Sequence, residues 1–395
     1  MALTALCTEQ DEHEMDENIE RLLSPFSLGN VTLANRVVMA PMTRQRSRID
    51  GMPVDVNRLY YQQRASAGLI ITEGLYPSLM GKGYVFAPGL VSEDHATGWR
   101  EVTDAVHADG GVIFAQIMHA GRISDPLMLP QGNVPVAPSS VQPDVHARHY
   151  TVNSPRAARP YGQPRALSTS EVYDVIAEFA RCAMLAQAAG FDGVEIHAAS
   201  GYLPMQFLSP NTNVRTDEFG GSIANRARFL LNIVDAMQKA TNAGFVAVKL
   251  SPGWTYHDVF DDDAEETYAH VTRELSSRGL AYLHVGNFGQ PWDVHGLLRP
   301  LFDGPYLVTS GYTRSSAGAL IAAGGADMVA FGQSFIANPD LVNRFRHGWG
   351  LNRPDRATYY TQGAEGYVDY PLYGEEGDAS LIDIDSQPLP IGRSR

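Results

Sequence analysis

Three polar side chains that could take part in catalysis lie close together at the start of the stretch His197–Ser222. The sequence HAASGYLPMQFLSPNTNVRTDEFGGS places His197, Ser200 and Tyr202 on one turn, directly after the apolar run FDGVEI. An imidazole exchanges protons and donates hydrogen bonds near neutral pH, and a phenol is a weak acid. The Asn, Asp and Gly residues that follow are typical of a loop, and Ser222 is suited to cap the next helix. The turn is therefore the first candidate for a catalytic site.

Two further polar side chains fall on runs that have the pattern of buried strands. Side chains alternate between the two faces of a strand, so Glu195 and His197 share a face, which we expect to point into a barrel. The same parity puts Gln116 and Met118 on one side of VIFAQIM, and Lys249 ends the run FVAVKL. A glutamine amide and an ammonium group would then meet at the barrel mouth. A structural histidine and a Lys249–Glu195 pair remain the alternatives.

The elements that must position these residues form a regular series. Apolar runs rich in β-branched residues alternate with longer amphipathic stretches, as in parallel strands buried on both faces. The runs are RVVMAP, GLIITEG, GVIFAQIM, DGVEIH, FVAVKL, AYLHVG, YLVTSG and DMVAFG. Their number predicts a (β/α)₈ TIM barrel, with a doubly wound open sheet as the alternative.

Seven amphipathic stretches between these runs predict helices, and Ser170 and Ser222 are suited to cap two of them. The predicted helices span Val54–Ala67, Thr97–Ala108, Ser170–Ala189, Ile223–Ala240, Ala264–Ser277, Ser315–Ala323 and Pro339–His347.

A long segment rich in proline and glycine interrupts the alternation after the third strand. It spans residues 120–169 and would leave the carboxyl end of the barrel, where active sites lie, so we expect it to cap the substrate. We expect residues 1–20 to be a disordered acidic tail, residues 21–375 to form one barrel domain and residues 376–395 to be flexible. The tyrosine-rich segment after Arg353 should fold back over the same face.

Composition limits the classes of partner. The chain has 395 residues, with 30 basic and 44 acidic side chains and a net charge of −14. This charge disfavours nucleic acid and anionic membranes. The two cysteines, Cys7 and Cys182, fit neither a disulfide framework nor a zinc site, and we expect no bound metal. Because no signal peptide or long apolar run occurs, we expect a cytoplasmic protein.

The last two predicted strands end in small residues. VTSGYTRSSAG and VAFGQSF lead into helices, and after strands seven and eight a barrel commonly binds phosphate through backbone N–H groups. Ser310, Gly311 and Gly332 fit this use. Ordinary strand-to-helix turns also favour glycine and serine, so this alternative stays open.

Taken together, the motifs resemble the Old Yellow Enzyme family of FMN-containing ene-reductases, which have a (β/α)₈ barrel. The resemblance runs from LLSPFSLGNVTLANRVVMAPMTR to FGQSFIANPDLVNRF, nearly the whole chain beyond the acidic tail. It includes ITEG, FAQIMHAGR, GFDGVEIHAASGYLPMQFLSPNTNVRTDEFGGSIANRARF, VKLSP and SGYT in the family's order and spacing.

The resemblance implies an FMN site and a nicotinamide reductant, NADPH or NADH. Thr43 would lie near the flavin carbonyl at C4, and Gln116 would bond the pyrimidine edge of the ring. The cofactor-binding residues that it implies are Pro41, Met42, Thr43, Gly74, Gln116, Lys249, Ser310, Gly311, Gly332 and Gln333.

The resemblance also implies roles at the substrate. His197 would polarise the carbonyl of an α,β-unsaturated substrate, and Tyr202 would protonate Cα while flavin N5 delivers hydride to Cβ. Ser200 and Met118 would line the pocket, and Tyr370 resembles a tyrosine that closes it from the C-terminal tail. We therefore expect the stretch His197–Ser222 to carry catalytic residues as far as Tyr202 and to form a structural loop after it.

Four positions depart from the family's pattern. Ser200 stands where asparagine or a second histidine is usual, so the second carbonyl donor is reduced or lost. Lys249 replaces an arginine that faces flavin N1 and lacks its bidentate fork. Gln333 replaces a phosphate-binding arginine, and Met118 replaces a tryptophan, which should open the pocket.

The predicted function is therefore NAD(P)H-dependent reduction of a small enone-like molecule by a monomer or homodimer. The alternatives are flavin-dependent desaturation or redox-neutral isomerisation of a specialised metabolite. A flavin-free barrel that uses Lys249 as a Schiff-base nucleophile is a third hypothesis.

Overall fold

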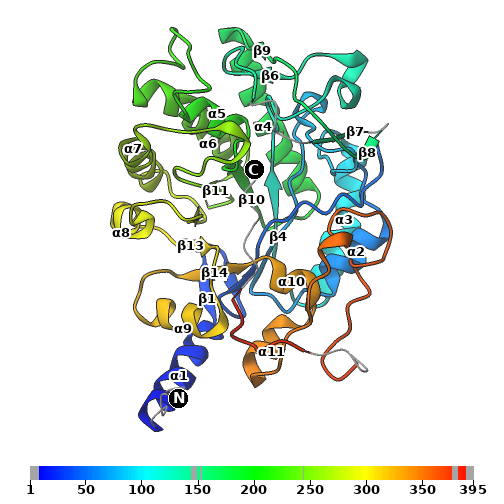
Figure 1. The fold of residues 1–395 in the computed structure, drawn as a ribbon, viewed down its shortest axis with the longest axis vertical. Helices are drawn as coiled ribbons and strands as arrows, with labels where there is room; N and C mark the ends of the chain where they lie inside the picture. Colours follow the sequence, from blue (N-terminus) through cyan, green and yellow to red (C-terminus); the bar gives the residue numbers. More distant parts are fainter. Residues whose placement is uncertain (1–8, 144–148, 152–153, 243, 376–380, 388–395) are drawn as a thin grey trace, which may run out of the picture.

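The chain folds around a closed barrel of eight parallel strands (Figure 1). The computed structural model describes residues 9–143, 149–151, 154–242, 244–375 and 381–387. The strands follow one another around the ring in sequence order, and the last pairs with the first. They are β3 (Val37–Met39), β4 (Leu69–Ile71), β5 (Ile113–Ile117), β10 (Gly193–Ala198), β11 (Val246–Leu250), β12 (Leu283–Gly286), β13 (Tyr306–Thr309) and β14 (Met328–Phe331). Closure confirms the predicted TIM barrel and excludes the open sheet.

Helices surround the barrel at the predicted places. They are α2 (Asp55–Gln62), α3 (Glu93–Ala108), α4 (Thr169–Ala188), α6 (Ile223–Ala240), α7 (Ala264–Ser276), α9 (Arg314–Ala322) and α11 (Leu341–His347), with the shorter α5 (Leu203–Leu208), α8 (Val294–Leu298) and α10 (Gln333–Ala337). Ser222 caps α6 as predicted. The cap of α4 is Ser168 rather than Ser170, because Ser168 and Glu171 form a reciprocal capping box.

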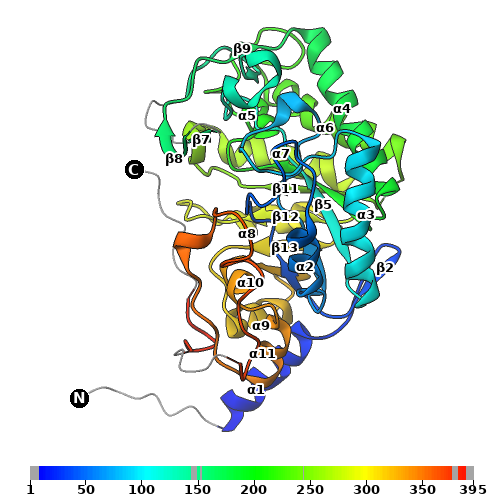
Figure 2. The ribbon, with the colours of Figure 1, turned by 90° about the vertical axis from the view of Figure 1, so that its right-hand side faces the viewer.

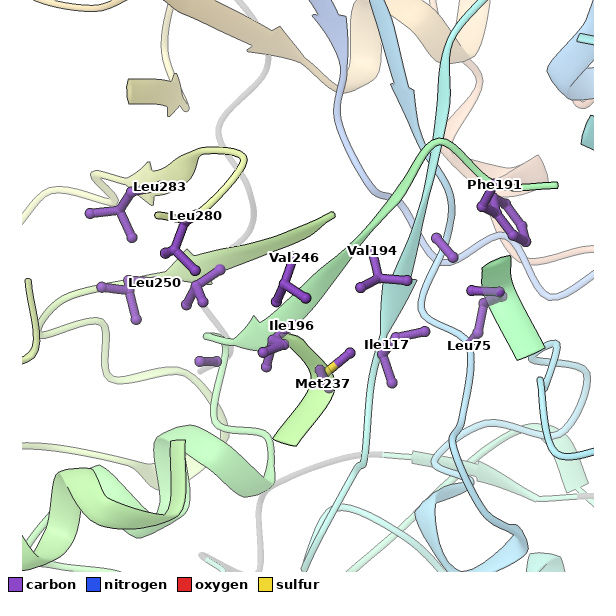
Figure 3. Close-up of a cluster of buried hydrophobic side chains, with 14 of the residues drawn as sticks. Leu75, Ile117, Phe191, Val194, Ile196, Met237, Val246, Leu250, Leu280 and Leu283 are labelled. Atoms are coloured by element: carbon purple, nitrogen blue, oxygen red, sulfur yellow. The ribbon is translucent and has the colours of Figure 1, made fainter. Parts of the chain in front are cut away.

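The core has two layers, as expected for strands buried on both faces. Val194 and Ile196 of β10 face outward and pack with Val246 of β11 and Met237 of α6 (Figure 3). The inner layer includes Phe114 of β5, and it also includes both leucines of the hairpin formed by β1 (Phe26–Leu28) and β2 (Val31–Leu33). The outward Val194 and Ile196 confirm the parity that turns Glu195 into the barrel.

The N-terminal segment is more ordered than its composition predicts. Residues Glu9–Leu22 form helix α1, whereas residues 1–8 lie outside the described part of the chain. Ile19 and Leu22 are buried, and the backbone of Asn18 packs closely on Gly318 of α9. Because most residues of this helix are acidic or polar, the sequence did not indicate the apolar contact. In both Figure 1 and Figure 2, α1 lies far from the end that carries β6 (Val136–Ala137) and β9 (Arg165–Ala166).

The segment between β5 and α4 contains small elements of its own. β6 pairs with β9, and the hairpin of β7 (His149–Thr151) and β8 (Ser154–Arg159) lies between them in sequence. The expected C-terminal tail starts and ends outside the described residues, but Ile382 pairs with Leu351 and Asp385 accepts hydrogen bonds from Ser315. These contacts show that residues 381–387 are attached to the barrel. No helix in the described ranges is long and apolar enough to cross a membrane.

Candidate active site

The predicted site residues gather at the carboxyl ends of the strands. Residues 41–43 follow β3, Gly74 follows β4, and Gln116 and Met118 lie at the end of β5. His197 and Lys249 are register partners on β10 and β11. Residues 310–311 follow β13, and residues 332–333 follow β14. Parallel closure therefore brings segments that are distant in sequence to one mouth.

A buried polar network anchors the strands beneath this mouth. The Glu195 carboxylate accepts a hydrogen bond from Gln116 Nε2 at 2.8 Å, and its other oxygen lies 2.8 Å from His284 Nδ1. Burial alone would raise the pKa of Glu195, but His284, Lys249 and Gln116 together hold it below its ordinary value. Lys249 forms no direct ion pair with Glu195 among the described residues. The alternative interpretation of Lys249 as the partner of Glu195 thus reduces to a longer-range attraction, and His284 is the direct partner.

His197 is almost completely buried. Its side chain is 7% exposed, and its Nδ1 atom is buried without a hydrogen-bond partner among the described residues. Burial lowers the pKa of His197 well below its ordinary value, and the charge of Lys249 lowers it further. The ring is therefore neutral at physiological pH. Its unpaired Nδ1 can still form a hydrogen bond with a bound molecule.

Tyr202 stands against His197. The ring centroids are 4.7 Å apart in an edge-on arrangement, and the hydroxyl of Tyr202 lies 2.6 Å from that of Tyr84. Burial raises the pKa of Tyr202, while the hydrogen bond with the Tyr84 hydroxyl opposes that rise. Tyr202 is therefore a protonated phenol, and Tyr84 can stabilise the phenolate that forms after proton donation.

Ser200 occupies an unusual backbone conformation between these two residues. Its φ angle is 57°, in the left-handed region that Asn adopts more readily than Ser. Its N–H donates to Ser251 Oγ at 2.9 Å, and its carbonyl oxygen lies 2.8 Å from His257 Nδ1. The turn is thus tied to the loop that follows β11.

The other side of the mouth is built from backbone. Ser310 and Gly311 have consecutive φ angles of 84° and 81°, and nothing lies within 4 Å of the position where a Cβ of Gly311 would stand. A strand-to-helix turn at this place in a barrel commonly presents backbone N–H groups to an anion. Gly332 lies close to the Met42 side chain. The start of α9, capped by Thr313, lies just beyond.

Gly74 and Met118 are in direct contact. A Cβ on Gly74 would stand 2.7 Å from the Met118 sulfur, so glycine is required for this approach. Met118 also packs with Tyr202 and with Tyr161 from the segment between β5 and α4. This contact places part of that segment over the predicted pocket. Thr43 and Pro41 are half-buried immediately after β3.

Tyr370 is the one predicted residue that the structure does not bring to this group. Its hydroxyl accepts a hydrogen bond from the N–H of Asp355, and its side chain lines a shallow depression with Gln63 and Pro371. Tyr360, ten residues earlier, is exposed and adds only slightly to the rise in pKa that burial causes in Tyr84 and Tyr202.

Sequence reasoning missed three other residues at the site. Tyr84 comes from GKGY, His257 from TYHD and His284 from YLHV. Only His284 had a local signal, because a polar residue interrupts an apolar strand. No cluster of three or more potential metal ligands occurs in the ranges that the structure describes.

Comparisons with known proteins agree with this geometry. Residues 21–352 match the model of the NADH:flavin oxidoreductase / NADH oxidase family. The structure of morphinone reductase in complex with tetrahydroNAD is similar at a TM-score of 0.86 and 41% identity, covering 91% of this chain and 99% of that one.

Two sequence relatives extend the comparison. The 12-oxophytodienoate reductase 7 of Oryza sativa subsp. japonica is 39% identical over 90% of this chain and 95% of its own length. A probable flavin mononucleotide-dependent alkene reductase of Leishmania infantum is 39% identical over 90% of this chain and 98% of its own. The chain belongs to the NADH:flavin oxidoreductase / NADH oxidase family.

Proposed function

We propose that the protein is an FMN-dependent ene-reductase that reduces the C=C bond of an α,β-unsaturated carbonyl compound with NADPH or NADH. The pairing of His197 with Tyr202, whose ring centroids are 4.7 Å apart, carries the proposal. The family supports flavin chemistry, and the names of the two reductases above support alkene and enone substrates.

The residues at the barrel mouth fit FMN. The backbone at Ser310 and Gly311 leaves open space for a phosphate, and Lys249 supplies positive charge beside the place proposed for the ring. The orphan Nε2 of His284 and the buried amide of Gln116 add polar groups on the barrel axis. In this proposal Pro41, Met42, Thr43 and Gly74 line the flavin, and Gly332 and Gln333 complete the phosphate site.

His197 and Tyr202 have separate tasks. Bound FMN supplies the hydride. As negative charge builds on the substrate oxygen, His197 donates a hydrogen bond to it and favours the transition state over the ground state. Tyr202 then gives its proton to Cα, and the hydroxyl of Tyr84 stabilises the phenolate left behind.

The competing hypotheses have less support. The flavin-free Schiff-base barrel conflicts with membership of a flavin family. Lys249 is buried, which lowers its pKa, but Glu195 opposes that shift. Desaturation and isomerisation would use the same residues, and no contact in the described structure favours them over reduction.

Anaerobic titration tests the proposal. We expect protein reconstituted with FMN to bleach on addition of NADPH or NADH and to regain its flavin absorbance when 2-cyclohexenone is added. A preparation that stays colourless after FMN addition would contradict the cofactor assignment. Bleaching without any recovery on addition of enones would contradict the reaction.

A further inference from the structure

His257 is a second histidine beside the catalytic turn, and the proposed reaction does not use it. It lies on the loop after β11, and its ring centroid is 5.6 Å from that of Tyr202 and 4.0 Å from that of Tyr256. Tyr161 contacts the ring edge-on at 6.4 Å. The imidazole therefore stands among the aromatic side chains that surround the proton donor.

The backbone of His257 is held in place by several contacts. Its φ angle is 59° and that of Asp258 is 58°, two consecutive left-handed conformations that are costly for residues other than glycine. Buried Arg122 donates to the carbonyl oxygens of both residues, at 3.1 and 2.6 Å. A Cβ on Gly201 would stand 2.7 Å from the His257 Cβ, so the loop packs directly on the catalytic turn.

The hydrogen bond to Ser200 fixes the tautomer of the ring. The Ser200 carbonyl oxygen can only accept, so Nδ1, which lies 2.8 Å away, carries the proton. Burial lowers the pKa of His257 to about 4, and the charge of Arg122 adds to that effect, so the ring is neutral near pH 7. A neutral imidazole with a protonated Nδ1 has a lone pair on Nε2. Nε2 is therefore an acceptor and cannot donate to an oxyanion.

The Nε2 atom of His257 is unpaired among the described residues. Because no described residue bonds to Nε2 and Nε2 is nevertheless not a buried unpaired atom, it keeps some exposed surface. An acceptor of fixed tautomer in this position selects for a donor on the bound molecule.

We propose that His257 is a specificity-determining residue that accepts, at Nε2, a hydrogen bond from a hydroxyl or N–H group attached next to Cα of the substrate. The inference rests on the proposed ene-reductase function. Cα must face Tyr202 to be protonated, and His257 adjoins Tyr202, so a substituent on Cα is closer to His257 than one on Cβ. The favoured substrate class is thus an enone with a donor-bearing α-substituent.

A matched pair of enones tests the proposal. The probes are 2-(hydroxymethyl)-2-cyclohexenone and 2-(methoxymethyl)-2-cyclohexenone, since methylation removes the donor and keeps the oxygen. We expect the wild-type kcat/KM to be about tenfold higher for the hydroxyl compound. In His257→Asn, which tolerates the left-handed backbone but is shorter, the ratio should fall to about one. His257→Gln, with a longer amide acceptor, should restore part of the preference.

Controls separate this inference from the proposed function. Tyr161→Phe keeps the ring next to His257 and should retain the tenfold ratio. Equal kcat/KM values for the two probes in the wild type, or a preference that survives in His257→Asn, would overturn the inference alone. A flavin-loaded wild type that reduces neither of the two probes nor 2-cyclohexenone would overturn both proposals.

The tautomer provides a readout that does not depend on turnover. Histidine ¹⁵N signals that are present in wild type at pH 7 and absent from His257→Asn belong to His257. We expect these signals to show a protonated Nδ1 and an unprotonated Nε2. Addition of the hydroxymethyl probe should shift the Nε2 resonance, and the methoxymethyl probe should shift it less. A protonated Nε2 would contradict the acceptor role.

Discussion

The two sides of the barrel mouth are built in different ways. The side formed by β10, β11 and β12 depends on side chains, with Glu195 fixed by Gln116 and His284. The side formed by β13 and β14 depends on backbone, with left-handed Ser310 and Gly311 and open space around the glycine. The first arrangement suits a reaction that needs positioned donors, and the second suits an anion held by N–H groups.

The difference predicts where substitutions will be tolerated. Activity that depends on one positioned side chain is lost when that side chain is removed. Affinity that depends on several backbone N–H groups changes gradually, because these groups share the ligand. The largest effects should therefore lie at the β10 turn and the smallest at the ends of β13 and β14.

Removing His197 should have the largest effect. His197→Ala deletes the donor to the substrate oxygen, and loss of one such donor slows turnover by on the order of 10²–10³. Stopped-flow reoxidation of the reduced enzyme by 2-cyclohexenone measures this step. FMN affinity should change little, and an unaltered reoxidation rate would remove His197 from the carbonyl site.

Ser200→Asn should act in the opposite direction. Asparagine adds an amide donor near His197 and adopts the left-handed φ of this position more easily than serine. We expect reduction of 2-cyclohexenone to accelerate by roughly tenfold, the effect of one hydrogen bond to a charged group. Unchanged or slower turnover would mean that Ser200 is a sufficient ligand or takes no part in carbonyl binding.

Acid should destabilise the folded protein through buried histidines at the mouth, among them His284 on β12 and His119 just after β5. Burial lowers the pKa of His119 to about 3 and that of His284 to about 4. Below about pH 6.5 the unfolded chain binds protons that the folded chain excludes, so stability falls with decreasing pH until the folded pKa values are reached. His119→Asn should reduce this slope by up to about 1.4 kcal/mol per pH unit.

Urea unfolding of wild type and His119→Asn between pH 4.5 and 7.5 measures the difference. Asn can accept the hydrogen bond that Gly121 N–H gives to His119 Nδ1, which makes it a conservative replacement. If the free energy of unfolding changes with pH in the same way in the two proteins, His119 takes up a proton in the folded state as readily as in the unfolded chain.

The smallest effect should lie on the backbone side. Gln333→Arg adds a charged, bidentate donor next to the proposed phosphate position. We expect FMN to bind roughly five- to tenfold more tightly, measured by quenching of flavin fluorescence on titration. An unchanged dissociation constant would mean that backbone N–H groups alone determine phosphate affinity.

Sequence patterns predicted the parts of the molecule that depend on local chemistry. The apolar runs located the barrel strands, and side-chain alternation correctly turned Glu195 inward. The same reasoning could not identify His284 as the direct partner of Glu195, because that contact joins residues 89 positions apart, on β10 and on β12 beyond the intervening β11. Helix α1 was missed because burial of Ile19 depends on α9, about 300 residues away.

The candidate site shows the same limit. His197 and Tyr202 are five residues apart and were found together, whereas Tyr84 reaches Tyr202 from 118 residues away. The sequence indicated Tyr370 for the pocket, but its hydroxyl is bonded by the N–H of Asp355, away from the other site residues. Long-range packing decides that orientation.

The role of Tyr202 tests the central claim most directly. Stopped-flow kinetics should separate flavin reduction by NADPH or NADH from reoxidation by 2-cyclohexenone, in wild type and in Tyr202→Phe. Phenylalanine keeps the ring against His197 but removes the proton. We predict that flavin reduction stays within about twofold of wild type while reoxidation slows by on the order of 10²-fold. Equal reoxidation rates in the two proteins would contradict the assignment of Tyr202 as the proton donor.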